Sequence, residues 1–181
     1  MVRPKLTPEQ IADEESRTSS LGLLRYAHEY QRAADTVKKL DDGSIVPYML
    51  IAHSLELALK AFLRSRGATL ADLGRMAHSL PRLHREAMAR RIDRLWPIAQ
   101  EVLPTLELLD AANHRQAFRY IVNGTKSYPE WSAANLFAQG MVAALTEHCL
   151  RDRFGGKVGA AEIRRNRGHG NVFPKPVPRK P

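Results

Sequence analysis

A charged pair lies within the most apolar stretch of the chain, SLELALKAFLRSRG, residues 54–67. Glu56 precedes Lys60 by four residues, the spacing at which a carboxylate and an ammonium group meet on one helix face. His53 lies three residues before Glu56, so the three side chains form a narrow polar stripe on an otherwise apolar helix. Two interpretations stay open: a solvated helix edge with an ordinary ion pair, and a polar cluster at a cleft or a dimer interface.

The cost of burial separates these two interpretations. An exposed pair at this spacing contributes only about 0.2–0.5 kcal/mol to helix stability. If neighbouring helices cover the stripe, Glu56 and Lys60 need further partners, because an unpaired buried charge costs several kcal/mol. A cluster that supplied those partners would be a candidate ligand-binding site.

A second candidate site is the irregular stretch FRYIVNGTKSYP, residues 118–129. Arg119 is flanked by Phe118 and Tyr120, and Lys126 follows; aromatic and basic side chains on such a segment can stack a base and hold a phosphate. Alternatively, Phe118 and Tyr120 close one end of a helical bundle while Arg119 pairs with an acidic residue. We therefore count Arg119, Tyr120 and Lys126 as candidate ligand-binding residues.

Other chemistry has no motif in this sequence. The seven histidines include no H-E-x-x-H or E-x-x-H pair, the single Cys149 cannot form an internal disulfide, and no C-x-x-C is present. No glycine-rich phosphate loop and no nucleophile elbow is found. We therefore predict no metal site and no cofactor, and we interpret Cys149 as a small core residue.

Positive charge is concentrated at the C-terminus. Residues 151–181 contain nine Lys or Arg against two acidic residues, whereas residues 1–150 contain nineteen against seventeen. From about Lys157 the segment is rich in arginine and proline and lacks a hydrophobic period, so we expect a disordered arm that either contacts a polyanion or only aids solubility. We find no apolar leader and no segment near the ~20 apolar residues of a membrane helix, so we expect a cytoplasmic protein without membrane contact.

Helical spacing dominates the rest of the chain, and we predict an all-α fold. Capping signals at Thr7, Ser19 or Ser20 and Ser79 start helices, Gly67 ends the apolar one, and a final long helix covers about Trp131 to Arg153. A segment from Pro97 is kinked or restarted at Pro104. The helix after Ser19 carries one apolar face that should meet other helices: Leu23, Tyr26, Tyr30, Ala33, Val37 and Leu40.

Short links between these helices favour antiparallel neighbours. We therefore predict an up-and-down antiparallel bundle of four to five helices with a disordered basic C-terminal tail. The expected division is a lead-in helix over 1–18, the bundle over 19–155 and the basic tail over 156–181.

The stretches LIAHSLELALKAFLRSRG and AHSLPRLHREA together resemble the HEPN family (higher eukaryotes and prokaryotes nucleotide-binding). Its members carry an E-x-x-x-K core helix, a loop, and an H-[DS]-L that opens the next helix; Glu56, Lys60 and His78-Ser79-Leu80 match these positions. The resemblance covers roughly residues 20–155. It implies an all-α bundle, commonly a homodimer, that cuts RNA or binds nucleotide or RNA, often beside a nucleotidyltransferase partner.

One departure from the family bears on catalysis. Catalytic HEPN ribonucleases carry an Arg, four to six residues, and then a His, and here the only such spacing is Arg164 to His169. In the basic tail nothing would hold these side chains in a catalytic geometry. We therefore favour a non-catalytic binding module for RNA, nucleotide or a nucleotidyltransferase-type partner. The alternative is a metal-independent endoribonuclease of toxin-antitoxin or defence type, using Arg164 and His169 or a site around Arg119 and His78.

Overall fold

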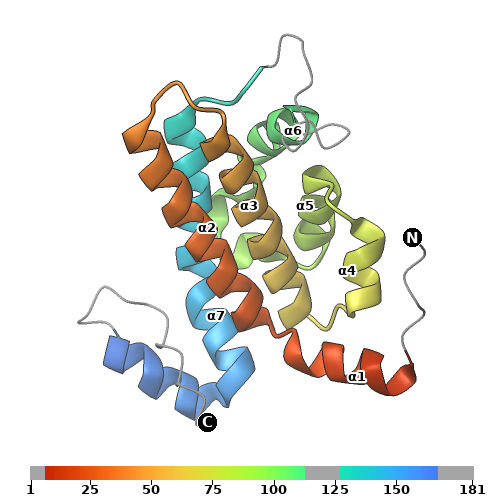
Figure 1. Cartoon of the computed structure of the whole chain (residues 1–181). Coiled ribbons are helices and arrows are strands. Elements are labelled where there is room, and N and C mark those ends of the chain that lie inside the picture. The colour runs from red at the N-terminus through yellow and green to blue at the C-terminus, as the bar shows by residue number, and fades with distance from the viewer. Residues whose placement is uncertain (1–6, 113–126, 167–181) are drawn as a thin grey trace, which may run out of the picture.

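Helices joined by short links make up the part of the chain that the structure describes (Figure 1). The computed structural model describes residues 7–112 and 127–166, and these ranges contain no strand. The predicted all-α class is therefore confirmed. The helices within these ranges are α1 Pro8–Arg17, α2 Ser20–Leu40, α3 Val46–Ser65, α4 Leu70–Met76, α5 Leu80–Ala89, α6 Leu103–Ala112 and α7 Trp131–Asn166, with short 3₁₀ helices at Ile92–Arg94 and Pro97–Gln100.

Local sequence signals set the ends of these helices. Thr7 and Gln10 form the predicted capping box at the start of α1, each side chain bonding the other's backbone N–H, at 3.3 and 2.8 Å. Ser19 caps α2 by accepting from the N–H of Gly22 at 3.1 Å. Gly67 follows the end of α3 with a φ of +84°, a conformation that glycine adopts without steric cost.

The segment that contains two prolines forms two separate helices. Pro97 begins the 3₁₀ helix Pro97–Gln100, and Pro104 lies in the first turn of α6. Proline is tolerated in a first turn because the N–H it lacks would have no helical partner there. Of the two predicted outcomes, the structure shows the restart.

The hydrophobic core surrounds α3. This helix packs against α2, α7, α5 and α6, while α2 also packs against α7 and α5 against α6. Figure 1 shows α2 and α3 side by side, with the short helices α1 and α4 near the C-terminal end of α3. The largest fully buried side chains of α3 are Ile51, Leu55, Leu59, Phe62 and Leu63. Burial of such side chains, at roughly 1.5–3 kcal/mol each, is what holds α3 in place.

The predicted buried face of α2 is wrong. The residues that face the core are Leu21, Leu24, Ala27, Gln31 and Ala34. In the predicted face Tyr26 is 59% exposed and Leu40 is 82% exposed. Both faces have helical spacing, and small alanines at 27 and 34 allow the α2 and α3 backbones to approach closely. Of the remaining predicted residues, Ala33 is exposed and Leu23, Tyr30 and Val37 are half-buried. We call the set Leu23, Tyr26, Tyr30, Ala33, Val37 and Leu40 the outer face of α2.

Helix α3 has the length and apolarity of a membrane span. Its 20 residues include an 18-residue window of mean hydropathy 1.3, so the prediction that no segment approaches such a span is wrong on length and composition. In the fold, 61% of that window is buried inside the protein. The core helix of a folded domain has the same properties, so the apolar character of α3 follows from its packing.

Helix α7 extends further than predicted. Gly155 breaks its regular geometry with φ +76° and ψ 163°, close to the predicted end at Arg153, but helix continues to Asn166. The prediction of a disordered or extended arm from about Lys157 is therefore wrong for residues 157–166. The physical reason is composition, because KVGAAEI contains several good helix formers and the prolines begin only at Pro174. Residues 167–181 lie outside the described residues.

Candidate functional site

The polar stripe on α3 is a buried cluster around one carboxylate. Glu56 is only 6% exposed, and its Oε1 lies 2.6 Å from Nζ of Lys60 and 3.0 Å from Nδ1 of His78. Nδ1 of His53 lies 3.6 Å from Oε2. The Lys60 side chain is 14% exposed, whereas that of His78 is 62% exposed. We call Glu56, Lys60, His53 and His78 the Glu56 cluster.

Two elements build this cluster. His53, Glu56 and Lys60 come from successive turns of α3, at spacings of three and four residues. His78 comes from the link between α4 and α5, where Ala77 has φ +53° and ψ −124°. A residue with a side chain rarely adopts this conformation, and it places the next residue, His78, over α3. The contact of His78 with Glu56 therefore accompanies a strained backbone conformation at Ala77.

The surroundings of Glu56 keep it ionised. Burial by itself would raise the pKa of this carboxyl above its ordinary 4.5, but the nearby His53 ring, the hydrogen bond from Lys60, and the charges of Lys60 and His78 lower the pKa to about 2. An ionised carboxylate only accepts hydrogen bonds, so Nδ1 of His78 is the donor in this contact. Nε2 is then the ring atom that His78 presents to solvent.

His53 connects the cluster to α2. Its ring meets the ring of Tyr30 edge to face, with centroids 4.5 Å apart. Tyr30 belongs to the outer face of α2, so the Glu56 cluster and that apolar face adjoin. His53 was noted in the sequence only as part of the stripe. The sequence did not predict its contact with Tyr30. The helical spacing that places Tyr30 on a face of α2 meant to meet other helices was the available signal.

The structure brings together three of the sequence-predicted site residues. Glu56, Lys60 and His78 converge, although His78 is 22 residues from Glu56 in the chain. Arg119, Tyr120 and Lys126 lie outside the described residues, as does His169. Arg164 lies in the last part of α7, where only the backbone is described. The ligand-binding and catalytic roles of all these residues stay predictions.

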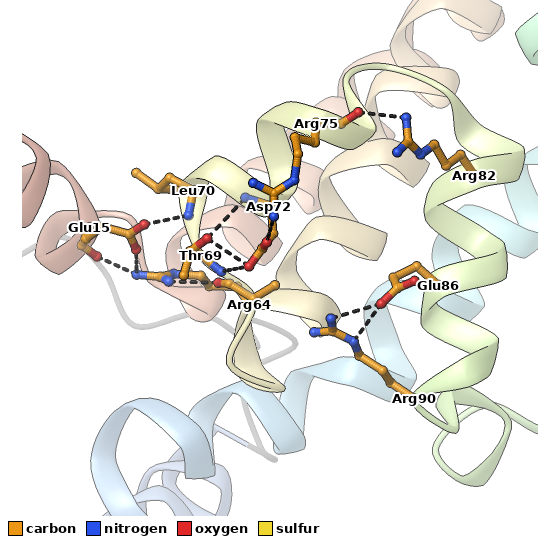
Figure 2. Close-up of polar contacts among 10 residues, drawn as sticks. Glu15, Arg64, Thr69, Leu70, Asp72, Arg75, Arg82, Glu86 and Arg90 are labelled. Carbon is orange, nitrogen blue, oxygen red and sulfur yellow. Dashed lines mark hydrogen bonds and ion pairs between the residues drawn. The ribbon is translucent and has the colours of Figure 1, made fainter. Parts of the chain in front are cut away.

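A second polar cluster, centred on Arg64, holds α4, the helix that precedes His78, against α1 and α3. Arg64 of α3 donates to the backbone carbonyls of Thr18 at 2.9 Å, Ala68 at 2.8 Å and Glu15 at 2.6 Å. Its Nη2 also pairs with the Glu15 carboxylate at 2.6 Å, and that carboxylate accepts from the N–H of Leu70 at 2.6 Å. Figure 2 shows this clamp joining α1, α3 and the start of α4. Every nitrogen of the guanidinium is used, so Arg64 is a structural residue.

A serine–histidine contact lies on the opposite side of α3 from the α4–α5 link. Oγ of Ser65 is 2.8 Å from Nε2 of His148 and 2.6 Å from the carbonyl oxygen of Phe62. The hydroxyl has one proton, and the carbonyl can only accept it, so His148 donates to Ser65. Burial, followed by the charge of Arg66, lowers the pKa of His148. In this arrangement the histidine does not take the serine proton, so the pair is not an activated nucleophile.

No group of three or more His, Cys, Asp or Glu side chains in the described ranges is arranged to hold a metal ion. The buried thiol of Cys149 has a pKa raised to about 12 by burial, which keeps it protonated and unreactive. Among the described residues, the Glu56 cluster is therefore the site with the strongest case for binding.

No family model, curated protein or solved structure matches this chain. The resemblance to HEPN proteins depends on the motif residues alone and stays a prediction.

Proposed function

We propose that this chain is a HEPN-like binding module, an up-and-down helical bundle that binds RNA or nucleotide at the Glu56 cluster without catalysing a reaction. The observation that carries the proposal is the convergence of Lys60 and His78 on the buried carboxylate of Glu56. His78 is exposed and held in one orientation, so it can donate to a phosphate when protonated. The resemblance also implies a nucleotidyltransferase-type protein as a partner of the assembled module.

The electrostatics of Glu56 support a binding role. A general acid or base works best when its pKa lies near the working pH. With a pKa of about 2, Glu56 neither donates nor accepts a proton in neutral solution. Its chemistry is limited to neutralising Lys60 and orienting His78, which are positioning tasks.

We further propose that the protein acts as a cytoplasmic homodimer through the outer face of α2. The six residues of this face alternate spacings of three and four, the heptad pattern with which two helices pair. Three of them, Tyr26, Ala33 and Leu40, are exposed and the other three are half-buried, so the monomer covers this face only in part. Because Tyr30 touches His53, a second copy that packs there brings its own Glu56 cluster close to the first.

The alternative function, a metal-independent endoribonuclease, has one observation in its favour. The ionised Glu56 accepts from Nδ1 of His78, which leaves a neutral His78 with Nε2 as a proton acceptor facing solvent. A histidine oriented by a carboxylate in this way is suited to general base catalysis. The cation that would stabilise the phosphorane has to come from Arg119, Arg164 or a second protomer.

Binding of a fluorescein-labelled single-stranded RNA, followed by anisotropy at low salt, tests the proposed function. We expect His78→Gln to weaken binding about tenfold, the loss of one charge-assisted hydrogen bond. The matched control His28→Gln changes a histidine on α2 outside the cluster and should change affinity less than about twofold. Equal loss in both variants, or unchanged binding by His78→Gln, would show that RNA does not bind at this cluster.

Incubating the same RNA with wild-type protein and EDTA separates the two functions. Intact RNA after prolonged incubation supports the binding module. Cleavage that disappears in His78→Gln, in Arg119→Ala or after removal of residues 167–181 supports the endoribonuclease and identifies the part of the chain that carries it.

A further inference from the structure

A small hollow lies between α4 and α5, and Glu56 is not among the residues that line it. Its volume is about 190 Å³, and its lining residues are Asp72, Arg75, Met76, Arg82, Glu86 and Arg90. Sites for whole small molecules start at roughly 300 Å³. The hollow therefore suits one functional group of a larger ligand.

Three arginines and two acids line this hollow. Arg75 pairs with Asp72, and Arg90 pairs with Glu86 at 2.9 Å. Arg82 has no acidic partner in the described part of the chain: its Nη1 donates to the backbone carbonyl of Arg75 at 2.8 Å. Figure 2 shows this contact running from α5 to α4, with Glu86 further along α5 and Arg90 just after its end. The Arg82 guanidinium thus keeps Nε and Nη2 available for a ligand.

The walls of the hollow are fixed in advance. Oδ2 of Asp72 accepts from the N–H and the hydroxyl of Thr69, both at 2.8 Å, in a capping box that starts α4. The Arg64–Glu15 clamp holds the neighbouring Leu70. The two hydrogen bonds from Thr69, followed by the charges of Arg75 and Arg90, lower the pKa of Asp72. Asp72 therefore stays ionised and bound, and it does not need to rearrange when an anion enters beside Arg82.

We propose that this hollow binds a terminal phosphate, with Arg82 as its principal ligand and Arg90 and Arg75 as flanking cations. A phosphate monoester carries between one and two negative charges near neutral pH and presents several acceptor oxygens. The planar guanidinium matches such an oxyanion with two parallel hydrogen bonds. The excess of one cation in the lining favours this anion over a neutral or cationic group. The inference deepens the proposed function, because it names the ligand group and a second site for it.

Two sources could supply this group, a free nucleotide and the 5′ end of an RNA. AMP against adenosine tests the first, and a 5′-phosphorylated oligoribonucleotide against its 5′-hydroxyl twin tests the second. We expect the phosphorylated member of at least one pair to bind wild-type protein about tenfold more tightly, as the hydrogen bonds to a charged group require. If neither pair shows a difference, the hollow does not bind a terminal phosphate and the proposal is wrong.

Arg85 provides a matched control on the same helix. It is exposed, lies three residues from Arg82, and does not line the hollow. Arg82→Gln should remove the preference for the phosphorylated ligand, whereas Arg85→Gln, with the same loss of charge, should retain it. Equal effects of the two variants would indicate attraction to net charge alone and would overturn the proposal.

Substitution of Arg82 also removes its hydrogen bond to the Arg75 carbonyl. A measurement on the wild-type protein is therefore needed beside the variants. Arginine Nε–H signals of ¹⁵N-labelled wild-type protein, followed during titration with AMP, should show Arg82 responding and Arg85 unchanged. Arg82→Lys keeps the charge but loses the planar pair of parallel donors, so it should fold and lose only part of the affinity. If Arg82 responds neither to AMP nor to the 5′-phosphorylated oligoribonucleotide although RNA binds, this inference fails and the proposed function stands. If Arg82 responds to AMP but the Glu56 cluster binds no RNA, the proposed function fails and this inference stands.

Discussion

Nδ1 of His78 lies 3.0 Å from Oε1 of Glu56 and joins the α4–α5 link to the centre of α3. The contact connects an exposed imidazole to a buried carboxylate that also pairs with Lys60. Removing the carboxylate would leave Lys60 without a partner in a largely covered position. Stability and binding are therefore both expected to depend on Glu56.

Glu56 makes the stability of the protein sensitive to acid. Its pKa is about 2 in the fold against an ordinary 4.5. Because the folded pKa is the lower one, the stabilisation is fully present above pH of about 4.5 and is lost as the pH falls toward about 2. A shift of this size corresponds to roughly 3 kcal/mol. Urea unfolding measured at several pH values between 7 and 2 would show this loss.

Glu56→Gln removes this acid sensitivity. We expect the variant to lose about 3–5 kcal/mol at pH 7, the cost of breaking a buried ion pair from one side. The matched control Glu29→Gln breaks a surface pair with Arg25, both side chains being more than a third exposed, and should cost at most about 1 kcal/mol. Identical pH profiles for wild type and Glu56→Gln would contradict the assigned pKa.

Arg64 holds α1 on the body of the protein. Arg64→Lys cannot reach the carbonyls of Thr18, Ala68 and Glu15 together, so the variant should lose about 2 kcal/mol of stability or more. Limited proteolysis should cut the variant around α1 before the rest of the chain. Arg85→Lys, at an exposed position, is the control. Unchanged protection of α1 in Arg64→Lys would show that other contacts hold this helix.

Ala77 is strained, and glycine should relieve the strain. Its φ of +53° is unfavourable for a residue with a side chain, a cost of about 1–3 kcal/mol. Ala77→Gly should therefore stabilise the protein by about 1 kcal/mol, net of the entropy that glycine adds to the unfolded chain. Ala143→Gly, at an exposed position inside α7, should destabilise it by about 0.5–1 kcal/mol. Thermal unfolding of both variants tests the difference in sign.

The outer face of α2 predicts the oligomeric state. Light scattering after gel filtration should report a dimer for wild-type protein. A charged residue at either exposed apolar position, Tyr26→Glu or Leu40→Glu, should produce a monomer, because burying an unpaired carboxylate in an interface costs several kcal/mol. Thr36→Glu, exposed on α2 but outside this face, should leave the dimer intact. A monomeric wild type would show that the second copy does not pack there.

Much of the fold could be predicted from local signals. The capping box at Thr7 and Gln10, the cap at Ser19 and the glycine after α3 lie where the sequence places them, because each depends on neighbouring residues only. The buried face of α2 could not be predicted, because two apolar faces with helical spacing compete on that helix. Close packing of α2 on α3 decided between them, through Ala27 and Ala34.

The same division applies to the candidate site. The sequence alone determined that Glu56 and Lys60 share one face of an apolar helix, since the spacing of four residues dictates it. Only the tertiary structure decided that His78 completes the cluster and that Arg82 is left without an acidic partner among the described residues. Helical periodicity acts over a few residues, whereas these partners meet because the core fixes how α3, α4 and α5 pack.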